Sequence, residues 1–344
     1  TSPKPGVTMK DIAREVGVTI AAVSLALKNH PSISEARRKE VHAAAARLGY
    51  RPNAMATALA HHRLQSHFHP VEAALAFVNT YPDPTELHAK PAFEEYWRGA
   101  TMTAEKFGYR LEEFPVNEKQ TLKRLERIFL TRNIRGIILG PLPPGESGVN
   151  WESFAWNKFA VVRCGFREQS PPFHYVTSAQ TTNTMLAFDK MRERGYQRIG
   201  FAGYWDKARR FGPGFLWSQH EPSLQSRLPP FFFSKEAPEL NQQRQFEQWL
   251  KEVKPDAILT DSLAVTAMLK KAGYRVPKDI GLAATNVRDM PVDAGIDQNT
   301  EEIGRVYTLA VISLIHDSDY GKPKFAREIL VPGEWMDGKS LPFR

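Results

Sequence analysis

Cysteine is almost absent from this chain, and the shortage limits how the fold can be held together. The 344 residues include one cysteine, Cys164. A single thiol cannot form an intrachain disulfide, and chains with few cysteines are typical of reducing compartments. We therefore expect a hydrophobic core without a disulfide framework, in a cytoplasmic protein.

Long apolar runs and catalytic motifs are missing as well. The sequence has no run of about 18 apolar residues and no charged leader followed by an apolar stretch, so neither membrane insertion nor secretion is expected. It contains no Gly-x-Ser-x-Gly, no Walker loop and no His-Glu-x-x-His, and Cys164 has no convincing catalytic partners. We expect no enzyme activity and no cofactor.

Positive charge is concentrated at the N-terminal end of the chain. Residues 1–63 contain ten Lys and Arg against four Asp and Glu, a net charge of +6, while the whole chain carries +8. The other 281 residues therefore carry only +2. A basic segment attached to a nearly neutral body indicates a domain that binds the phosphates of nucleic acid.

The first 50 residues show the start and stop signals of three short helices. Thr8 can cap the first helix, and Gly17 can end it in the left-handed conformation. Thr19 is expected to cap a second helix over 20–29, after a break of about three residues that is typical of a helix-turn-helix. Ser34 is expected to cap the third. A protein-binding adaptor would show the same pattern, but the positive charge favours DNA.

Several motifs along the chain resemble those of the lactose-repressor (LacI/GalR) family of bacterial transcription regulators. They are MKDIAREVGV, AAVSLAL, SEARRKEV and LGYRPNAMATAL near the N-terminus, then RERGYQRIGFAG, PDAILTDSLAVTAMLKKAGYRVPKDIGL and AGIDQNTEEIG in the body. They follow one another in the family's order, so the resemblance covers nearly the whole chain. It implies a DNA-binding head, a hinge helix and a body of two subdomains like a periplasmic binding protein.

The resemblance also implies that the start of the second helix enters the major groove. Ile20, Ala21 and Leu25 then occupy the base-reading positions, where family members commonly carry tyrosine or valine, a polar residue and arginine. Apolar side chains cannot form bidentate hydrogen bonds with guanine or adenine, which leaves thymine methyl groups and DNA shape to be read. Specificity is then loose or supplied by the hinge. Three more positions match phosphate contacts of the family: Thr19, Ser24 and Lys28.

Residues 51–63 match the family's hinge and linker. Asn53 can cap a short helix. The resemblance implies that Leu59 wedges into the minor groove and kinks the duplex, with Met55 and Ala56 as its support. The alternative is that Leu59 only packs within the helix. So short a helix is marginal alone and is expected to order on DNA.

Four histidines follow the hinge, at His61, His62, His67 and His69. Such a cluster can bind a transition metal. The spacing is irregular and no cysteine lies near, so we interpret the segment as a solvated linker and expect no metal.

Short apolar strands alternate with amphipathic helices from residue 71 onward. This alternation predicts α/β domains whose parallel sheets are covered by helices on both faces. The expected domains are a helix-turn-helix head over 1–50, a hinge and linker over 51–63, and a body over 64–344. By resemblance, the first subdomain covers about 70–177 and 309–328, and the second about 178–308 and 329–344.

The resemblance places a small-molecule cleft between the two subdomains. Its candidate lining residues are Tyr81, Ser178, Trp205, Arg209, Arg210, Phe211, Trp217, Asp261 and Asn286. One arginine of the adjacent pair would clamp a sugar, and the choice between the two stays open. Core aromatics, a helix-capping aspartate and a solvated arginine are the alternatives. The family often has acidic residues where Ser178 and Asn286 stand, so the effector differs from the usual hexoses or none binds.

These features predict a ligand-responsive, DNA-binding transcription regulator, most simply a repressor. One head covers only a half-site, so a homodimer on a palindromic operator is expected. Two alternatives remain open: a solute-binding protein with a vestigial head, and a sugar-modifying enzyme with a fused head.

Overall fold

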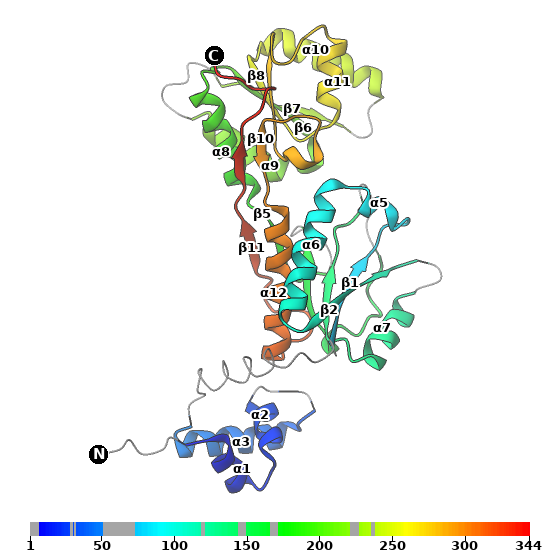
Figure 1. The fold of residues 1–344 in the computed structure, drawn as a ribbon, viewed down its shortest axis with the longest axis vertical. Helices are drawn as coiled ribbons and strands as arrows, with labels where there is room; N and C mark the ends of the chain where they lie inside the picture. The colour runs from blue at the N-terminus through cyan, green and yellow to red at the C-terminus, as the bar shows by residue number, and fades with distance from the viewer. Residues whose placement is uncertain are drawn as a thin grey trace, which may run out of the picture.

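The protein consists of a three-helix head and a body of two α/β subdomains (Figure 1). The computed structural model describes residues 7–27, 30, 32–50, 73–117, 121–143, 149–165, 171–220, 227–234 and 238–344. Over these ranges the predicted fold class, a helical head followed by parallel-sheet α/β layers, is confirmed.

The head contains helices α1 (Met9–Val16), α2 (Ile20–Leu27) and α3 (Glu35–Leu48). The backbone N–H and the hydroxyl of Thr8 both donate to the carboxylate of Asp11, at 2.9 and 2.7 Å. Gly17 ends α1 with φ +70°, a left-handed conformation that glycine adopts without strain. The side chain of Ser34 caps α3 by accepting a hydrogen bond from the N–H of Arg37 at 3.4 Å. The predicted caps therefore set the ends of these helices.

The first subdomain is built on a six-stranded sheet in the order β11-β5-β4-β3-β1-β2, with every pair parallel. Its elements are β1 (Ala73–Asn79), α5 (Thr85–His88), α6 (Pro91–Lys106), β2 (Tyr109–Pro115), α7 (Leu122–Thr131), β3 (Gly136–Leu139), η1 (Trp156–Lys158), β4 (Ala160–Cys164), β5 (His174–Ser178), α12 (Thr300–Asp317) and β11 (Glu328–Val331). Two of these elements come from the far end of the chain.

The second subdomain has a sheet in the order β12-β10-β9-β8-β6-β7, parallel except for β12. Its elements are α8 (Gln180–Glu193), β6 (Ile199–Tyr204), η2 (Trp205–Lys207), α9 (Ala208–Ser218), β7 (Phe231–Phe233), α10 (Glu239–Val253), β8 (Ala257–Thr260), α11 (Ala264–Lys271), β9 (Gly281–Ala284), η3 (Val287–Asp289), β10 (Gly295–Asp297) and β12 (Glu334–Met336).

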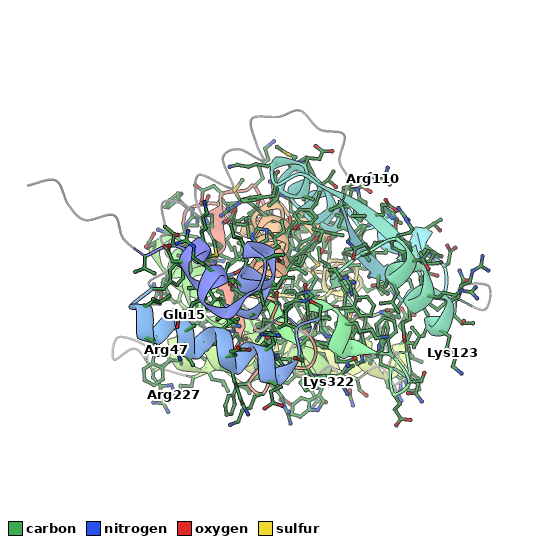
Figure 2. All side chains as sticks on the ribbon, turned by 90° about the horizontal axis from the view of Figure 1, so that it is seen from below. Glu15, Arg47, Arg110, Lys123, Arg227 and Lys322 are labelled. Carbon is green, nitrogen blue, oxygen red and sulfur yellow. The ribbon has the colours of Figure 1, made fainter. Side chains whose placement is uncertain are left out.

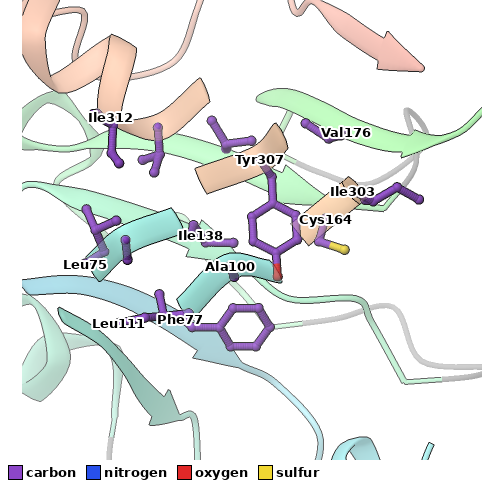
Figure 3. Close-up of a cluster of buried hydrophobic side chains, with 14 of the residues drawn as sticks. Leu75, Phe77, Ala100, Leu111, Ile138, Cys164, Val176, Ile303, Tyr307 and Ile312 are labelled. Atoms are coloured by element: carbon purple, nitrogen blue, oxygen red, sulfur yellow. The ribbon is translucent and has the colours of Figure 1, made fainter. Parts of the chain in front are cut away.

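Helices α6 and α12 cover one face of the first sheet with a continuous apolar core (Figure 3). Phe77 of β1 and Tyr307 of α12 are fully buried within it. Burying such a side chain stabilises the fold by about 1.5–3 kcal/mol. Cys164 also lies in this core, and burial raises the pKa of its thiol to about 12. The thiol is therefore protonated and unsuited to nucleophilic chemistry.

Glycine lets the backbones of α6 and α12 approach each other closely. A Cβ atom at Gly304 would lie 2.1 Å from the carbonyl oxygen of Tyr96, and one at Gly99 would lie 2.0 Å from that of Glu301. No side chain fits such a space. The two helices therefore depend on these glycines to pack against each other.

The late crossover between subdomains lies elsewhere than the expected boundaries at about 309 and 329. Helix α12 begins at Thr300 and buries Ile303 in the first core, and β11 pairs with β5 of the first sheet as far as Val331. The chain therefore crosses near 298–299 and again near 332–333. The physical reason is that Ile303, Tyr307 and Val311 form one apolar stripe, so α12 packs as a whole.

No helix in the described ranges combines the length and apolarity needed to cross a bilayer.

Candidate functional sites: the DNA-reading helix and the junction between subdomains

Helix α2 presents one face to solvent and buries the other in the core of the head. Val23 and Ala26 are fully buried, whereas Ile20 is 47% exposed and Ala21 is exposed beside it. The Thr19 hydroxyl oxygen caps the helix, accepting a hydrogen bond at 3.1 Å from the N–H three residues on. Its O–H proton can still be donated to a phosphate. Two other predicted contacts on this helix, Ser24 and Leu25, are half-buried.

Part of the basic charge of the head is ion-paired. The pairs are Arg14 with Asp11 at 3.8 Å, Arg37 with Glu40 at 2.8 Å, Lys39 with Glu35 at 2.8 Å and Arg47 with Glu15 at 2.6 Å. Exposed pairs of this kind contribute at most about 1 kcal/mol each and are screened by salt. Pairing does not change net charge, so the head keeps the positive field that attracts DNA.

Several predicted residues lie outside the described ranges. These are the DNA contacts Lys28, Asn53, Met55, Ala56 and Leu59, and the linker histidines His61, His62, His67 and His69. In the part of the chain that the structure describes, no cluster of three His, Cys, Asp or Glu side chains could hold a metal ion.

The carboxyl ends of β1, β6 and β9 converge where the two subdomains meet. Tyr81, after β1, is only 1% exposed, and its hydroxyl donates to the carbonyl of Leu142 at 3.3 Å. The same hydroxyl accepts from the ammonium of Lys90 at 2.5 Å. Tyr81 therefore positions Lys90 at this junction.

Asp261 and Asn286 close the other side of the junction. One Asp261 oxygen accepts the N–H of Tyr204 at 3.0 Å, and the other lies 3.7 Å from the ammonium of Lys207. Asp261 thus holds the end of β6. Asn286 caps η3 and donates to Asp289 at 2.9 Å.

Three other predicted effector residues line one cavity of about 220 Å³ at the crossover from β5 to α8: Ser178, Arg209 and Arg210. Ser178 is 3% exposed, and its hydroxyl accepts a hydrogen bond from the side-chain amide of Asn183 at 2.8 Å. Thr181 donates its hydroxyl to the carbonyl of Arg210 at 3.2 Å. The structure thus brings both arginines to the same cavity.

The predicted aromatic residues do not gather into one stacking face. Phe211 is 5% exposed and packs near Phe201 in the core of the second subdomain. Its position fits the alternative given above, that the aromatic residue belongs to the core. Trp217 is 68% exposed and stacks on His220 on the outer part of α9. Only Trp205, 69% exposed in η2, follows a strand end that faces the junction.

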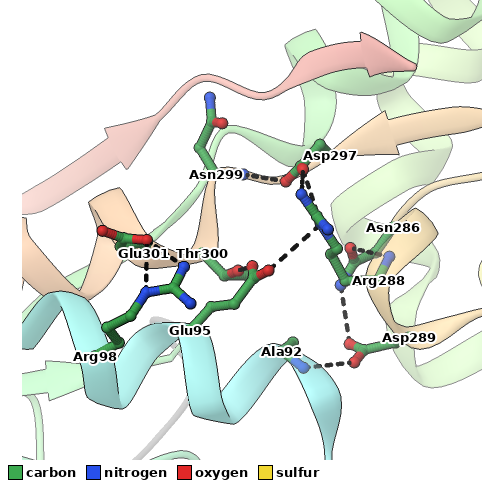
Figure 4. A network of polar contacts seen from close by, with 10 residues as sticks. All are labelled: Ala92, Glu95, Arg98, Asn286, Arg288, Asp289, Asp297, Asn299, Thr300 and Glu301. Carbon is green, nitrogen blue, oxygen red and sulfur yellow. Dashed lines mark hydrogen bonds and ion pairs between the residues drawn. The ribbon is translucent and has the colours of Figure 1, made fainter. Parts of the chain in front are cut away.

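A polar network at the crossovers joins the subdomains, and sequence reasoning did not find it (Figure 4). Arg288 of η3 contacts Asp297 at 2.7 Å and Glu95 of α6 at 3.5 Å. Thr300 donates to the same Glu95, and the N–H of Ala92 donates to Asp289 at 3.3 Å. The hydrogen bond and charge of Asp297, and then the charge of Glu95, raise the pKa of Arg288.

The network borders a cavity of about 300 Å³, which is also lined by Arg98, Asn299 and Glu301. Its partners are up to about 200 positions apart in the sequence, with Glu95 on α6 and Thr300 on α12. The only sequence signal was the motif AGIDQNTEEIG, which marked the crossover without indicating the partners of its acids.

Two family models match this chain, one over the head and one over much of the body. The family model described as bacterial regulatory proteins, lacI family, matches residues 8–53, and the model of a periplasmic binding protein-like domain matches residues 188–341. The HTH-type transcriptional regulator MalR of Streptococcus pneumoniae is 24% identical over 338 residues, which span 94% of this chain and 97% of MalR.

Solved structures share the fold. A complex of the transcriptional regulator CelR with cellobiose superposes with a TM-score of 0.57 at 18% identity, covering 98% of this chain and 100% of CelR. A structure of the lac repressor dimer bound to operator and the anti-inducer ONPF superposes with a TM-score of 0.54 at 19% identity. It covers 98% of this chain and 100% of the lac repressor chain. The chain thus combines a helix-turn-helix head that matches the lacI family with a two-sheet body that matches periplasmic binding protein-like domains, and its relatives are HTH-type transcriptional regulators.

Proposed function

We propose that this protein is a repressor whose affinity for operator DNA is changed by a small molecule bound between the two body subdomains. The observation that supports it most is the exposed face of α2, held outward by its Thr19 cap and the buried Val23 and Ala26. A regulator of this kind works in the cytoplasm, on the DNA itself.

The chemistry of α2 favours reading by apolar contact. Ile20, Ala21 and Leu25 offer methyl groups to thymine and no hydrogen-bond donor to guanine. The phosphates then supply most of the affinity, through Thr19 and the basic charge of the head. Leu59 supplies the kink if it wedges into the minor groove, so Leu59→Ala should weaken binding to duplex DNA without unfolding the protein.

Two copies are needed to cover a palindromic site, because each head reads one half-site. The lac repressor in the solved structure is a dimer on its operator. Sedimentation of the full-length chain should therefore give a dimer.

The proposed effector is a sugar or a related polyhydroxylated metabolite. The neighbouring CelR structure contains cellobiose. At the junction, Asp261, Asn286 and Lys90 offer both acceptors and donors for hydroxyl groups, while the arginines at 209 and 210 offer donors in the cavity at the crossover, which these three residues do not line. We propose that the junction groups bind the ligand without catalysing its turnover.

Ligand binding regulates the protein by shifting the pose of one subdomain relative to the other. Arg288 and Asp289 contact α6 of the first subdomain, so a change of pose must rearrange these contacts. A ligand shifts this equilibrium only by its difference in affinity for the two poses.

Gel-shift titration of the full-length protein on the DNA upstream of its own gene tests the proposal. Binding is expected to weaken as salt rises and to change when one sugar of a panel is added. Sugar binding without any binding of duplex DNA would overturn the proposal and favour a solute-binding protein.

A further inference from the structure

A row of basic side chains follows one edge of the first sheet. All six strands are parallel, so their amino ends lie at the same edge. Arg110 lies at the start of β2, Arg135 directly precedes β3, Lys158 lies two residues before β4, and Arg327 directly precedes β11. We call this edge the amino edge. Neighbouring strands are about 4.8 Å apart, so the row extends for about 24 Å across six strands.

Backbone hydrogen bonds bring the members of the row together. The carbonyl of Arg135 accepts from Ala160 at 2.8 Å, and the carbonyl of Phe159, next to Lys158, accepts from Gly321 at 2.9 Å. Gly321 directly precedes Lys322. Lys158 and Lys322 are therefore anchored side by side, and Lys324 follows two residues later.

Three lysines on this edge are exposed and carry their charge without an acidic partner. Glu112 accepts hydrogen bonds from both Arg110 and Arg132, and Arg327 lies 3.4 Å from Asp319. Among the described residues, no carboxylate pairs with the three lysines, Lys158, Lys322 and Lys324. The Lys324 ammonium instead lies 5.4 Å from the centre of the exposed Phe325 ring.

Helix dipoles do not account for these lysines. A cation at a helix C-terminus is favourable in itself, which explains Arg132 at the end of α7. Lys158, however, lies in a short 3₁₀ turn, and Lys322 comes five residues after the end of α12. At the opposite edge of the same sheet, by contrast, cations are paired with acids, as Arg98 is with Glu301 and Arg305 with Glu302.

The amino edge is also where the head is attached. β1, the first strand of the body, starts at this edge at Ala73, and the chain that precedes it leads from the head. Figure 2 views this end of the molecule and shows Lys322, with Arg110 and Lys123 farther along the body. A duplex bound by the head is therefore kept close to this edge at high effective concentration.

We propose that the amino edge of the first sheet is a second DNA-contacting surface, in which Lys158, Lys322 and Lys324 contact phosphates of the duplex held by the head. This inference rests on the proposed function. The contacts add affinity and read no bases. They let the apolar α2 recognise sequence while the body supplies electrostatic binding that depends on salt.

The test uses the full-length protein and a fluorescent mixed-sequence duplex of about 40 base pairs, with binding measured between about 50 and 200 mM KCl. Each lost phosphate contact lowers the slope of log K against log salt by about 0.9. The variant Lys158→Gln/Lys322→Gln/Lys324→Gln should therefore have a slope shallower by about 1 to 3. The arginine triple variant, Lys158→Arg/Lys322→Arg/Lys324→Arg, should keep the wild-type slope.

The matched control is Lys251→Gln/Lys278→Gln/Lys339→Gln, which removes the same charge from exposed positions of the second subdomain. It should leave the slope unchanged. If both glutamine variants change the slope equally, or neither changes it, the inference is overturned while the proposed function stands. If the wild type itself ignores the duplex in low salt, the proposed function fails and the inference fails with it.

Discussion

Single residues of the head show how little hydrogen-bonding capacity the exposed face of α2 has to offer to a base edge. Ile20 and Ala21 are exposed on α2, and neither carries a polar atom in its side chain. Apolar contacts discriminate less strongly than bidentate hydrogen bonds. Affinity must then come mainly from charge, which agrees with the concentration of basic residues at the N-terminal end.

His88 makes the stability of the first subdomain depend on pH. Its ring contacts Glu113 at 2.7 Å and Glu94 at 3.4 Å. Burial lowers the pKa of His88, but the hydrogen bond and charge of Glu113, followed by those of Glu94, raise it overall above its ordinary 6.5. The folded protein therefore binds this proton more tightly than the unfolded chain does.

The stabilisation by His88 is fully present below pH 6.5 and is lost as pH rises through the higher folded pKa. In urea unfolding from acid to neutral pH, the wild type should lose stability relative to His88→Gln as pH rises through this window. Parallel pH profiles for the two proteins would show that the histidine does not act in this way.

At the scale of elements, the caps and the alternation of strands and helices could be predicted from the sequence because they depend on neighbours in the chain. Thr8, Gly17 and Ser34 occupy the predicted ends of helices. The late crossover could not be placed in this way. Nothing local in 300–317 tells which of two similar sheets that helix will cover, because the choice is made by packing against α6.

The candidate site could be predicted only in part, because some of its contacts depend on how distant segments pack together. Ser178, Arg209 and Arg210 do meet at one cavity. Phe211 instead fills the core, since an aromatic residue in a helix has the same spacing whether it faces ligand or protein. Glu95 and Arg288 are partners only because two subdomains fold against each other.

The contact between α6 and α12 depends on Gly304. The substitution Gly304→Ala places a methyl group 2.1 Å from the Tyr96 carbonyl oxygen, so the helices must separate. We expect a loss of about 1–3 kcal/mol in the free energy of unfolding, measured by urea titration. Ser313→Ala, at an exposed position of the same helix, should change it by less than about 0.5 kcal/mol. Equal losses of stability in Gly304→Ala and Ser313→Ala would mean that the close approach of α6 and α12 does not determine the stability of the subdomain.

At the scale of the whole molecule, few polar contacts link the two subdomains in the described ranges. Glu95 contacts Arg288 across the junction, whereas the neighbouring Arg98 pairs with Glu301 inside the first subdomain. A change of pose must alter the contact between Glu95 and Arg288, but it need not alter the pair of Arg98 with Glu301. This difference supplies a matched pair of variants.

Arg288→Gln should therefore alter the effect of the active sugar on DNA affinity by about 2- to 30-fold. Arg98→Gln should leave that effect nearly unchanged. The measurement is the dissociation constant for DNA with and without the sugar, for each variant. A similar change in both variants would indicate a general loss of stability instead of altered coupling between subdomains.

The most direct test of the central claim is the affinity of the full-length protein for the DNA upstream of its own gene, compared with Ala21→Glu. A carboxylate on the exposed face of α2 should repel the duplex and weaken binding by about 10- to 100-fold, while Ala46→Glu on the exposed surface of α3 should change it little. Equal affinity of the wild type and Ala21→Glu, or no binding by the wild type in low salt, would contradict DNA recognition through α2.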